Sequence, residues 1–165
     1  MLTVEEALQE ILRNVHPEAE TEEIVTLYSA GKILAAPVVS PIQVPPLDNS
    51  QMDGYAVRSS EFADGRLEFP VSEKIYAGHM GKPLKEGSVA RIFTGAPIPA
   101  GADAVIPQEE ATETGEGTVR FEKAPKAGAW IRKAGCDIEI GDVILKAGDR
   151  LTPAALGVAA SVGTS

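Results

Sequence analysis

The spacing of apolar residues changes twice along this chain, from helical at its start to strand-like in the middle and helical again at its end. The helical spacing near the N-terminus involves Val4, Ala7, Leu8, Ile11, Leu12 and Val15. Side chains three and four residues apart share one face of a helix, so this pattern predicts an amphipathic helix. Thr3 and Glu6 stand at the spacing of a capping box, which predicts where the helix begins.

From about residue 55 to residue 140, apolar and polar residues alternate with period two. Clear examples are Leu67-x-Phe69-x-Val71, Val119-x-Phe121 and Ile138-x-Ile140. Alternation of this kind is typical of strands with one buried face. The chain also contains 16 Gly and 12 Pro residues, which favour turns and short strands over long helices. We therefore predict a small β-barrel or β-sandwich for this region.

The last part of the chain is again helical in character. Thr152 is a suitable cap, Pro153 suits the first helical position, and Gly163 ends the segment. The intervening residues 154–162 are almost all apolar, so this helix requires cover on every side. We expect part of that cover to come from the first helix or from a second chain.

Helical ends around a β middle indicate that one domain is inserted into another. We predict an α+β, mainly β protein in which a small discontinuous helix-and-strand domain comprises residues 1–47 and 138–165. The inserted β domain comprises residues 48–137. Pro37 and Pro41 favour short edge strands and extended connectors around them. Pro45-Pro46 has the composition of a semi-rigid linker between the two bodies.

The charge and the cysteine content exclude several classes of protein. A net charge of −9 argues against a nucleic-acid partner, because binding phosphates requires clustered Lys and Arg. We expect no insertion into a membrane, since no apolar run reaches 18 residues. The single cysteine, Cys136, excludes an internal disulfide and fits the reducing cytoplasm. Together with His16 and His79 it cannot form a zinc site of ordinary spacing.

Polar residues suited to chemistry gather in the run Asp48-Asn49-Ser50-Gln51-Met52-Asp53-Gly54-Tyr55-Ala56-Val57-Arg58. Only one apolar residue precedes Tyr55, so the run has the composition of a polar turn that leads into a strand. Two further stretches of mixed polar and turn-forming residues follow, at residues 91–105 (RIFTGAPIPAGADAV) and 131–138 (IRKAGCDI).

These three stretches, in this order, resemble the MoeA-type molybdopterin molybdenumtransferases, the family of the gephyrin C-terminal domain. The resemblance covers essentially the whole chain, whereas family members continue well past Ser165. It implies that both ends of the chain form domain I and that the middle forms domain II. The pterin-binding domain III and the C-terminal domain IV of the family are expected beyond the last residue.

The resemblance also implies an activity. Such enzymes insert molybdate into adenylylated molybdopterin and release AMP during molybdenum cofactor biosynthesis. Their site lies between the β domain of one subunit and the pterin-binding domain of the partner subunit in a homodimer. We therefore expect the 165 residues to fold but to be inactive alone. The alternative is a non-catalytic interaction or dimerisation module, for which the apolar final helix is the notable feature.

The residues that the resemblance assigns to the site occupy all three stretches. It implies catalytic roles for Asp53, Thr94, Arg132 and Asp137, and contacts with the bound cofactor substrate for Asn49, Ser50 and Gly95. Asp53 and Asp137 are also the expected ligands of a divalent metal, Mg²⁺, which binds carboxylates together with substrate phosphates. Arg132 suits phosphate or molybdate oxygens because its planar fork can bind them bidentately.

Each of these residues also has a purely structural interpretation. Asp53 can cap the turn before Gly54, and Arg132 with Asp137 can form a surface ion pair worth less than ~1 kcal/mol. The turn from Thr94 to Pro97 can offer a hydroxyl and backbone N–H groups to an anion, or it can simply be rigid. Cys136 stands where relatives commonly carry an acid, which changes the charge beside Asp137.

Overall fold

The computed structural model describes residues 2–16, 20–115 and 117–164 of the chain. These residues belong to two compact units, Met1–Pro37 with Lys146–Ser165, and Val38–Leu145. The sequence placed the division at residues 47/48 and 137/138. The contacts instead assign residues 38–47 and 138–145 to the larger unit, in which the ends of these two segments pair with each other.

The smaller unit begins with helix α1, Val4–Asn14. The predicted capping box is present, because Thr3 Oγ1 accepts from Glu6 N at 3.2 Å and Thr3 N donates to the Glu6 carboxylate at 2.8 Å. No described residue of α1 is buried, so its apolar stripe is exposed. In the part of the chain that the structure describes, no helix has the length and apolar character needed to span a bilayer.

Helix α2, Pro153–Ser161, confirms the predicted C-terminal helix. Thr152 Oγ1 accepts from Ala155 N at 3.2 Å and caps the helix. The short 3₁₀ helix η1, Thr26–Tyr28, packs against α2. Thr26 Oγ1 also donates to Thr164 O at 3.2 Å, just after α2 ends. The sequence expected this cover from the first helix or a second chain, whereas the described contacts are made by η1.

In the larger unit, two extended segments far apart in the sequence form a narrow antiparallel ribbon. Its strands are β1, Val38–Val39, and β10, Val143–Leu145, and β1 confirms a short strand next to Pro37. The alternating segment at Ile138 and Ile140 was expected to be a strand, and this prediction is wrong. In the described part of the chain Ile138 forms only an isolated bridge to Val44, and Ile140 is 68% exposed.

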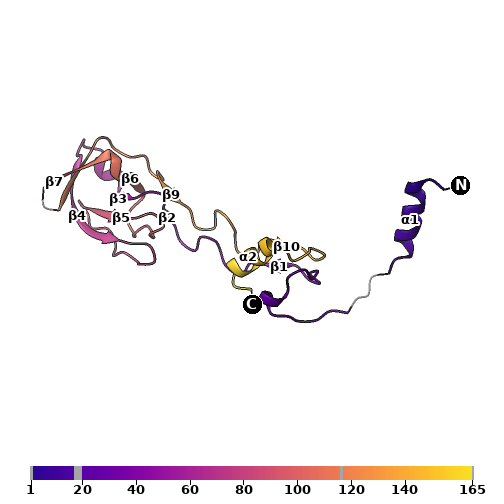
Figure 1. The fold of residues 1–165 in the computed structure, drawn as a ribbon. Coiled ribbons are helices and arrows are strands. Elements are labelled where there is room, and N and C mark those ends of the chain that lie inside the picture. Colours follow the sequence, from indigo (N-terminus) through magenta and orange to yellow (C-terminus); the bar gives the residue numbers. More distant parts are fainter. Residues whose placement is uncertain (1, 17–19, 116, 165) are drawn as a thin grey trace. The chain divides into compact units, whose positions relative to one another are not determined.

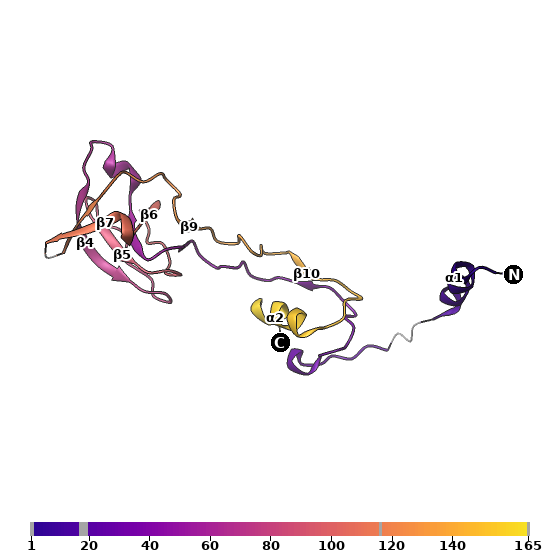
Figure 2. The same cartoon turned by 45° about the horizontal axis from the view of Figure 1, so that its top comes forward.

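The main body of the larger unit is one curled six-stranded sheet (Figures 1 and 2). Only β4 and β5 run parallel, and the other neighbouring pairs are antiparallel. This sheet confirms the mainly β class. In spatial order, the strands are β6 (Ala104–Pro107), β3 (Gly54–Val57), β5 (Val89–Ile92), β4 (Glu68–Ile75), β8 (Thr118–Phe121) and β7 (Ala111–Gly115).

The curled sheet has an apolar cluster on each face, whereas the alternation in the sequence predicted strands with one buried face. One cluster is aromatic and includes Tyr55, Phe69 and Phe121. The other is aliphatic and includes Ile92 and Val105. All four residues of β3 are buried; Tyr55 and Val57 belong to the aromatic cluster and Ala56 to the aliphatic cluster. Two 3₁₀ turns, η2 (Ser59–Phe62) and η3 (Gln108–Glu110), follow β3 and β6.

A second small ribbon carries the first part of the polar run. Strand β2, Asn49–Ser50, pairs antiparallel with β9, Ile131–Arg132. Ile131 is buried in the aliphatic cluster, which fixes β9 against the curled sheet. The segments at residues 49–54 and 131–137 are therefore held beside each other, although they are about eighty positions apart in the sequence.

Candidate functional site

Asp53 lies in the turn between β2 and β3, and Thr94 holds its carboxylate. Oδ1 of Asp53 accepts from Thr94 N at 2.8 Å and from Thr94 Oγ1 at 2.7 Å. These two bonds are the main reason that the pKa of Asp53 is lowered, and the nearby positive charge of Arg91 acts in the same direction. Asp53 is thus oriented and kept ionised. The structure brings together these two predicted residues.

Arg91 is the cation beside Asp53, and sequence reasoning did not assign it to the site. Its Nη1 donates to Gly54 O at 2.7 Å, and its Nη2 donates to Gln108 Oε1. The guanidinium carbon lies 4.6 Å from the centroid of the Phe93 ring and 5.2 Å from that of Tyr55. Arg91 lies on β5 and Phe93 directly follows that strand, two positions further on. Residues at this spacing share one face of an extended chain.

The second group of site residues lies in the turn after β9. The guanidinium of Arg132 forms an ion pair with Asp137 Oδ2, and its Nε donates to Cys136 Sγ at 3.4 Å. Cys136 Sγ in turn donates to Asp137 Oδ1 at 3.4 Å. Bonding to Arg132 lowers the pKa of Asp137 and raises that of Arg132. Nearly half of each side chain of the ion pair is exposed, so the pair adds little stability.

Gly135 makes the tight return of this turn feasible. Its φ is +73°, in the left-handed region that a side chain disfavours. The chain therefore turns sharply between Arg132 and Asp137 and places their charged groups in contact, which is the surface ion pair of the structural interpretation.

Strand β2 connects the two groups of site residues. On one side, Asn49 is the register partner of Arg132. On the other side, Ser50 N donates to Ala96 O at 2.9 Å and Gly95 N donates to Ser50 O at 2.8 Å, just after Thr94. The segment around Asp53 and Thr94 and the turn around Arg132 are thereby attached to the same two-residue strand.

The expected ligand-contacting residues on β2 differ in their exposure. The hydroxyl of Ser50 is buried and donates to Met52 O at 2.6 Å, so in this structure it stabilises the loop. Asn49 is half-buried, and Gly95 is exposed at the start of the turn. Contacts of Asn49, Ser50 and Gly95 with a bound ligand remain predictions.

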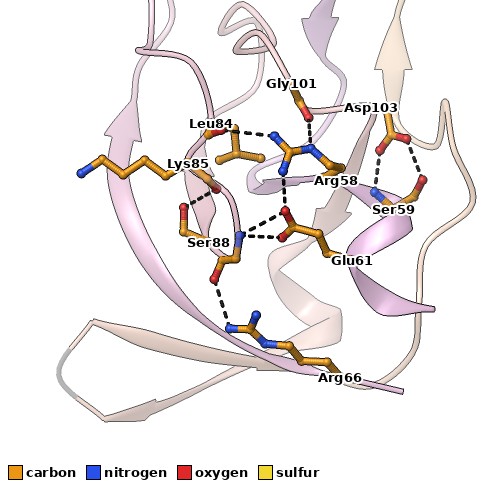
Figure 3. A network of polar contacts seen from close by, with 10 residues as sticks. Arg58, Ser59, Glu61, Arg66, Leu84, Lys85, Ser88, Gly101 and Asp103 are labelled. Atoms are coloured by element: carbon orange, nitrogen blue, oxygen red, sulfur yellow. Dashed lines mark hydrogen bonds and ion pairs between the residues drawn. The ribbon is translucent and has the colours of Figure 1, made fainter. Parts of the chain in front are cut away.

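Arg58, the last residue of the polar run, has a structural role rather than a place among the site residues (Figure 3). It pairs with Glu61, and its Nε donates to Gly101 O at 3.1 Å. Both carboxylate oxygens of Glu61 accept from Gly87 N at 3.1 Å. Next to this network, Ser59 N donates to Asp103 Oδ1 at 2.7 Å. The far end of the run is thus anchored within the β domain.

The carboxylates of the site fit a metal that takes few protein ligands. The described residues form no group of three or more His, Cys, Asp or Glu side chains able to hold a metal ion. The described bonds of Asp53 all engage Oδ1, whereas both oxygens of Asp137 are engaged by its neighbours in the turn. Mg²⁺ is compatible with this set, since one or two carboxylates together with substrate phosphates are its usual ligands.

Comparisons with known proteins agree with the architecture and the motifs. A family described as "MoeA N-terminal region (domain I and II)" matches residues 2–163. The molybdopterin molybdenumtransferase of Haemophilus influenzae is 42% identical over 167 residues, which cover 99% of this chain and 40% of that protein. Molybdopterin molybdenumtransferase 2 of Mycobacterium tuberculosis is 40% identical over 138 residues, covering 81% of this chain and 34% of the relative.

Solved structures give the same picture. The crystal structure of a molybdopterin biosynthesis moeA protein from Pyrococcus horikoshii matches with a TM-score of 0.84 and 32% identity. That alignment covers 99% of this chain and 43% of the solved chain. A second structure of a moeA protein from this organism matches with a TM-score of 0.88 and 29% identity. The chain thus spans less than half the length of the proteins it matches.

Proposed function

Because the chain belongs to the family of MoeA N-terminal regions, domains I and II, we propose that it forms one wall of a site that inserts molybdenum into molybdopterin. The relatives named molybdopterin molybdenumtransferase are more than twice as long as the matched region. We therefore assign the proposed activity, its substrates and its partners to a longer protein. The 165 residues alone are expected to fold without catalysing the reaction.

The observation that most supports this function is the double hydrogen bond from Thr94 to Asp53. Both bonds converge on Oδ1, so the described hydrogen bonds of Asp53 leave Oδ2 to a ligand. An oriented, ionised carboxylate next to a fixed cation is the kind of preorganised group that catalysis requires.

The proposed substrates are molybdate and adenylylated molybdopterin, and both are anions. A chain with a net charge of −9 must place its cations locally to bind them. Arg132 is exposed, and its fork can bind phosphate or molybdate oxygens. In this account Arg132 releases Asp137 as it takes up an anion, so Asp137 becomes available to a metal or a proton.

The proposed metal is Mg²⁺, which Asp53 would hold through Oδ2, with Asp137 as the second carboxylate. When bound, it would neutralise phosphate charge on the adenylylated substrate as AMP departs. The residues of this chain have separate tasks in that arrangement. Thr94 keeps the Asp53 carboxylate ionised and oriented, and the Arg132 guanidinium binds anionic oxygens.

The remainder of the site is proposed to come from a partner subunit in a homodimer, with a pterin-binding domain opposite the β domain. Such sharing is physically reasonable, because an acidic wall binds a polyanion only when a metal and a basic surface face it. We place this activity in the cytoplasm, since a chain with one cysteine can form no internal disulfide.

The test compares the 165-residue chain with the longer protein from which such regions come. Release of AMP from adenylylated molybdopterin, dependent on molybdate, is measured for both. The longer protein should turn over and the 165-residue chain should not. Turnover by the short chain would contradict the shared site, whereas an inactive longer protein would contradict the function itself.

A second experiment separates an enzyme from an interaction module. The ¹H–¹⁵N NMR spectrum of the chain is followed during titration with Mg²⁺ and AMP. We expect shifts confined to residues next to Asp53 and Asp137. Shifts confined to α2 instead would favour the interaction module, because α2 lies in the smaller unit and the site residues lie in the larger one.

A further inference from the structure

Asp48 binds the turn after β9 through both of its carboxylate oxygens. Oδ2 accepts from Lys133 Nζ at 2.7 Å, and Oδ1 accepts from the backbone N–H of Ala134 at 2.9 Å. Lys133 and Ala134 belong to the turn that carries Arg132 and Asp137. The side chain of Asp48 is therefore bonded to that turn at two residues that lie between Arg132 and Asp137.

The backbone of Asp48 is fixed on the opposite side. Its carbonyl oxygen accepts from Ile98 N at 2.9 Å, in the segment that follows Thr94. The next residue, Asn49, is the register partner of Arg132. One residue thus links the segment that orients Asp53 to the turn that carries the anion-binding guanidinium.

We propose that Asp48 is a positioning residue, which holds the turn at residues 132–137 in register with β2 so that Arg132 and Asp137 serve the same ligand as Asp53. This role rests on the proposed function. It assigns to the first residue of the polar run a task that is distinct from binding the substrate or a metal.

The two bonds of Asp48 contribute unequally. The Lys133 side chain is 66% exposed, and an exposed pair of this kind contributes little because a long side chain must be ordered to form it. The N–H of Ala134, in contrast, is part of the turn, so its bond to Oδ1 determines where the turn lies. We infer that the bond from Ala134 positions the turn and that the bond from Lys133 is secondary.

Three variants separate these contributions. Asp48→Asn keeps an oxygen that can accept from Ala134 N and removes the charge. Lys133→Met removes only the ion pair. Asp48→Ala removes both bonds. We therefore expect Asp48→Ala to displace the turn at residues 132–137. The other two variants should keep the turn close to its normal position and serve as controls.

Cys136 reports the geometry of the turn without any need for catalysis. It is the only cysteine of the chain, it is exposed, and its Sγ lies 3.4 Å from both Arg132 Nε and Asp137 Oδ1. At fixed pH, the rate at which iodoacetamide alkylates Cys136 depends on how often the side chains of Arg132 and Asp137 move away from its thiol. We expect about a fivefold faster rate in Asp48→Ala, because the turn opens more often. Asp48→Asn and Lys133→Met should remain within about twofold of the unmodified chain.

The unmodified chain offers a test that does not depend on any variant. If Ala134 N–H donates to Asp48, its amide resonance must follow the protonation of Asp48 during an acid titration by NMR. The bonds from Lys133 and Ala134 lower the pKa of Asp48, so this change should occur below the ordinary range of an aspartate. The proposal is overturned if the amide chemical shift of Ala134 does not change as Asp48 is protonated. It is also overturned if Asp48→Ala folds and the alkylation rate of Cys136 stays unchanged.

Activity of the longer protein supplies the functional test. There, Asp48→Ala should lower kcat by between about tenfold and a hundredfold, since small misplacements of catalytic groups are costly. Asp48→Asn should recover most of that loss, which general destabilisation by loss of a charge would not explain. Equal losses in Asp48→Asn and Asp48→Ala contradict the positioning role. An inactive unmodified protein counts against the proposed function alone, because the Cys136 and Ala134 measurements still decide the position of the turn.

Discussion

Thr94 donates both its backbone N–H and its hydroxyl to the same oxygen of Asp53, Oδ1, at 2.8 and 2.7 Å. The two residues are forty-one positions apart, and the pairing of β3 with β5 in the curled sheet brings them together. This contact joins the polar turn that carries Asp53 to the turn from Thr94 to Pro97. The titration of Asp53 therefore reports directly whether Thr94 donates to its carboxylate.

Removing only the hydroxyl of Thr94 should raise the pKa of Asp53 toward its ordinary value. In Thr94→Val the backbone N–H remains and the second bond is lost, so the charged carboxylate is less stabilised. Thr94→Ser keeps both donors and should leave the titration of Asp53 nearly unchanged. The ¹³C chemical shift of the Asp53 carboxyl group, followed through an acid titration, measures both variants. Identical titrations in Thr94→Val and the unmodified chain contradict this account of the bond.

Acid should weaken the fold through the carboxylates of the site. Asp48, Asp53 and Asp137 all have lowered pKa values when folded, so the unfolded chain binds more protons than the folded chain as the pH falls. Their contribution is present above the unfolded value of 3.8 and is lost as the pH falls through the lower folded values.

Urea unfolding measured between pH 7 and pH 2 checks this sign. The free energy of unfolding should decrease below about pH 4. The decrease should be smaller in Asp48→Asn, which no longer titrates at this position. A stability that rises on acidification below pH 4 would be the opposite of the expected result.

Gly54 should tolerate no side chain. A Cβ at this position would lie 2.1 Å from Ile106 O, in the strand that pairs with β3, and backbone cannot move aside cheaply. We expect Gly54→Ala to cost at least about 3 kcal/mol of unfolding free energy, measured by urea denaturation. The matched control is Gly157→Ala in α2, where the added methyl meets nothing within 4 Å. That variant should gain about 0.5–1 kcal/mol from helix propensity.

Trp130 adopts a backbone conformation that costs stability. Its φ is +56°, which is a left-handed conformation rarely adopted by a bulky residue. Its carbonyl oxygen accepts from Gln51 N at 3.0 Å, so the conformation is fixed by the pairing of β9 with the polar run. Trp130→Gly should therefore be more stable than Trp130→Ala by about 1 kcal/mol, because both lose the ring and only Gly relieves the strain. Equal stabilities of the two variants would show that φ at this position is unstrained.

Local signals in the sequence sufficed for the parts of the fold that depend on near neighbours. Both helices begin at the predicted caps, Thr3 and Thr152, because a cap involves residues only three positions away. The period-two segments at Phe69 and Phe121 became strands of the curled sheet. The segment at Ile138 has the same period, but in the described structure it forms only an isolated bridge to Val44. Periodicity alone does not reveal how far a segment will pair.

The candidate site could be predicted only in part, for a related reason. The motifs indicated Asp53, Thr94, Arg132 and Asp137, and the structure shows which of them pair. The interactions of Arg91 and Asp48 depend on segments that meet through long-range strand pairing, so their side chains gave no local signal. The spacing of residues along the chain also does not predict that the hydroxyl of Ser50 is buried.

The central claim is that Asp53 acts in molybdenum insertion, and one substitution tests it most directly. In the longer protein, Asp53→Asn keeps the size of the side chain and an acceptor for Thr94 but removes the charge. Molybdate-dependent AMP release should fall at least about a hundredfold, as expected when a preorganised charged group is lost, while the thermal unfolding midpoint changes little. Asp64→Asn, on an exposed turn of the same domain, is the matched control and should retain full activity. An Asp53→Asn protein that releases AMP at the rate of the Asp64→Asn protein would contradict the claim.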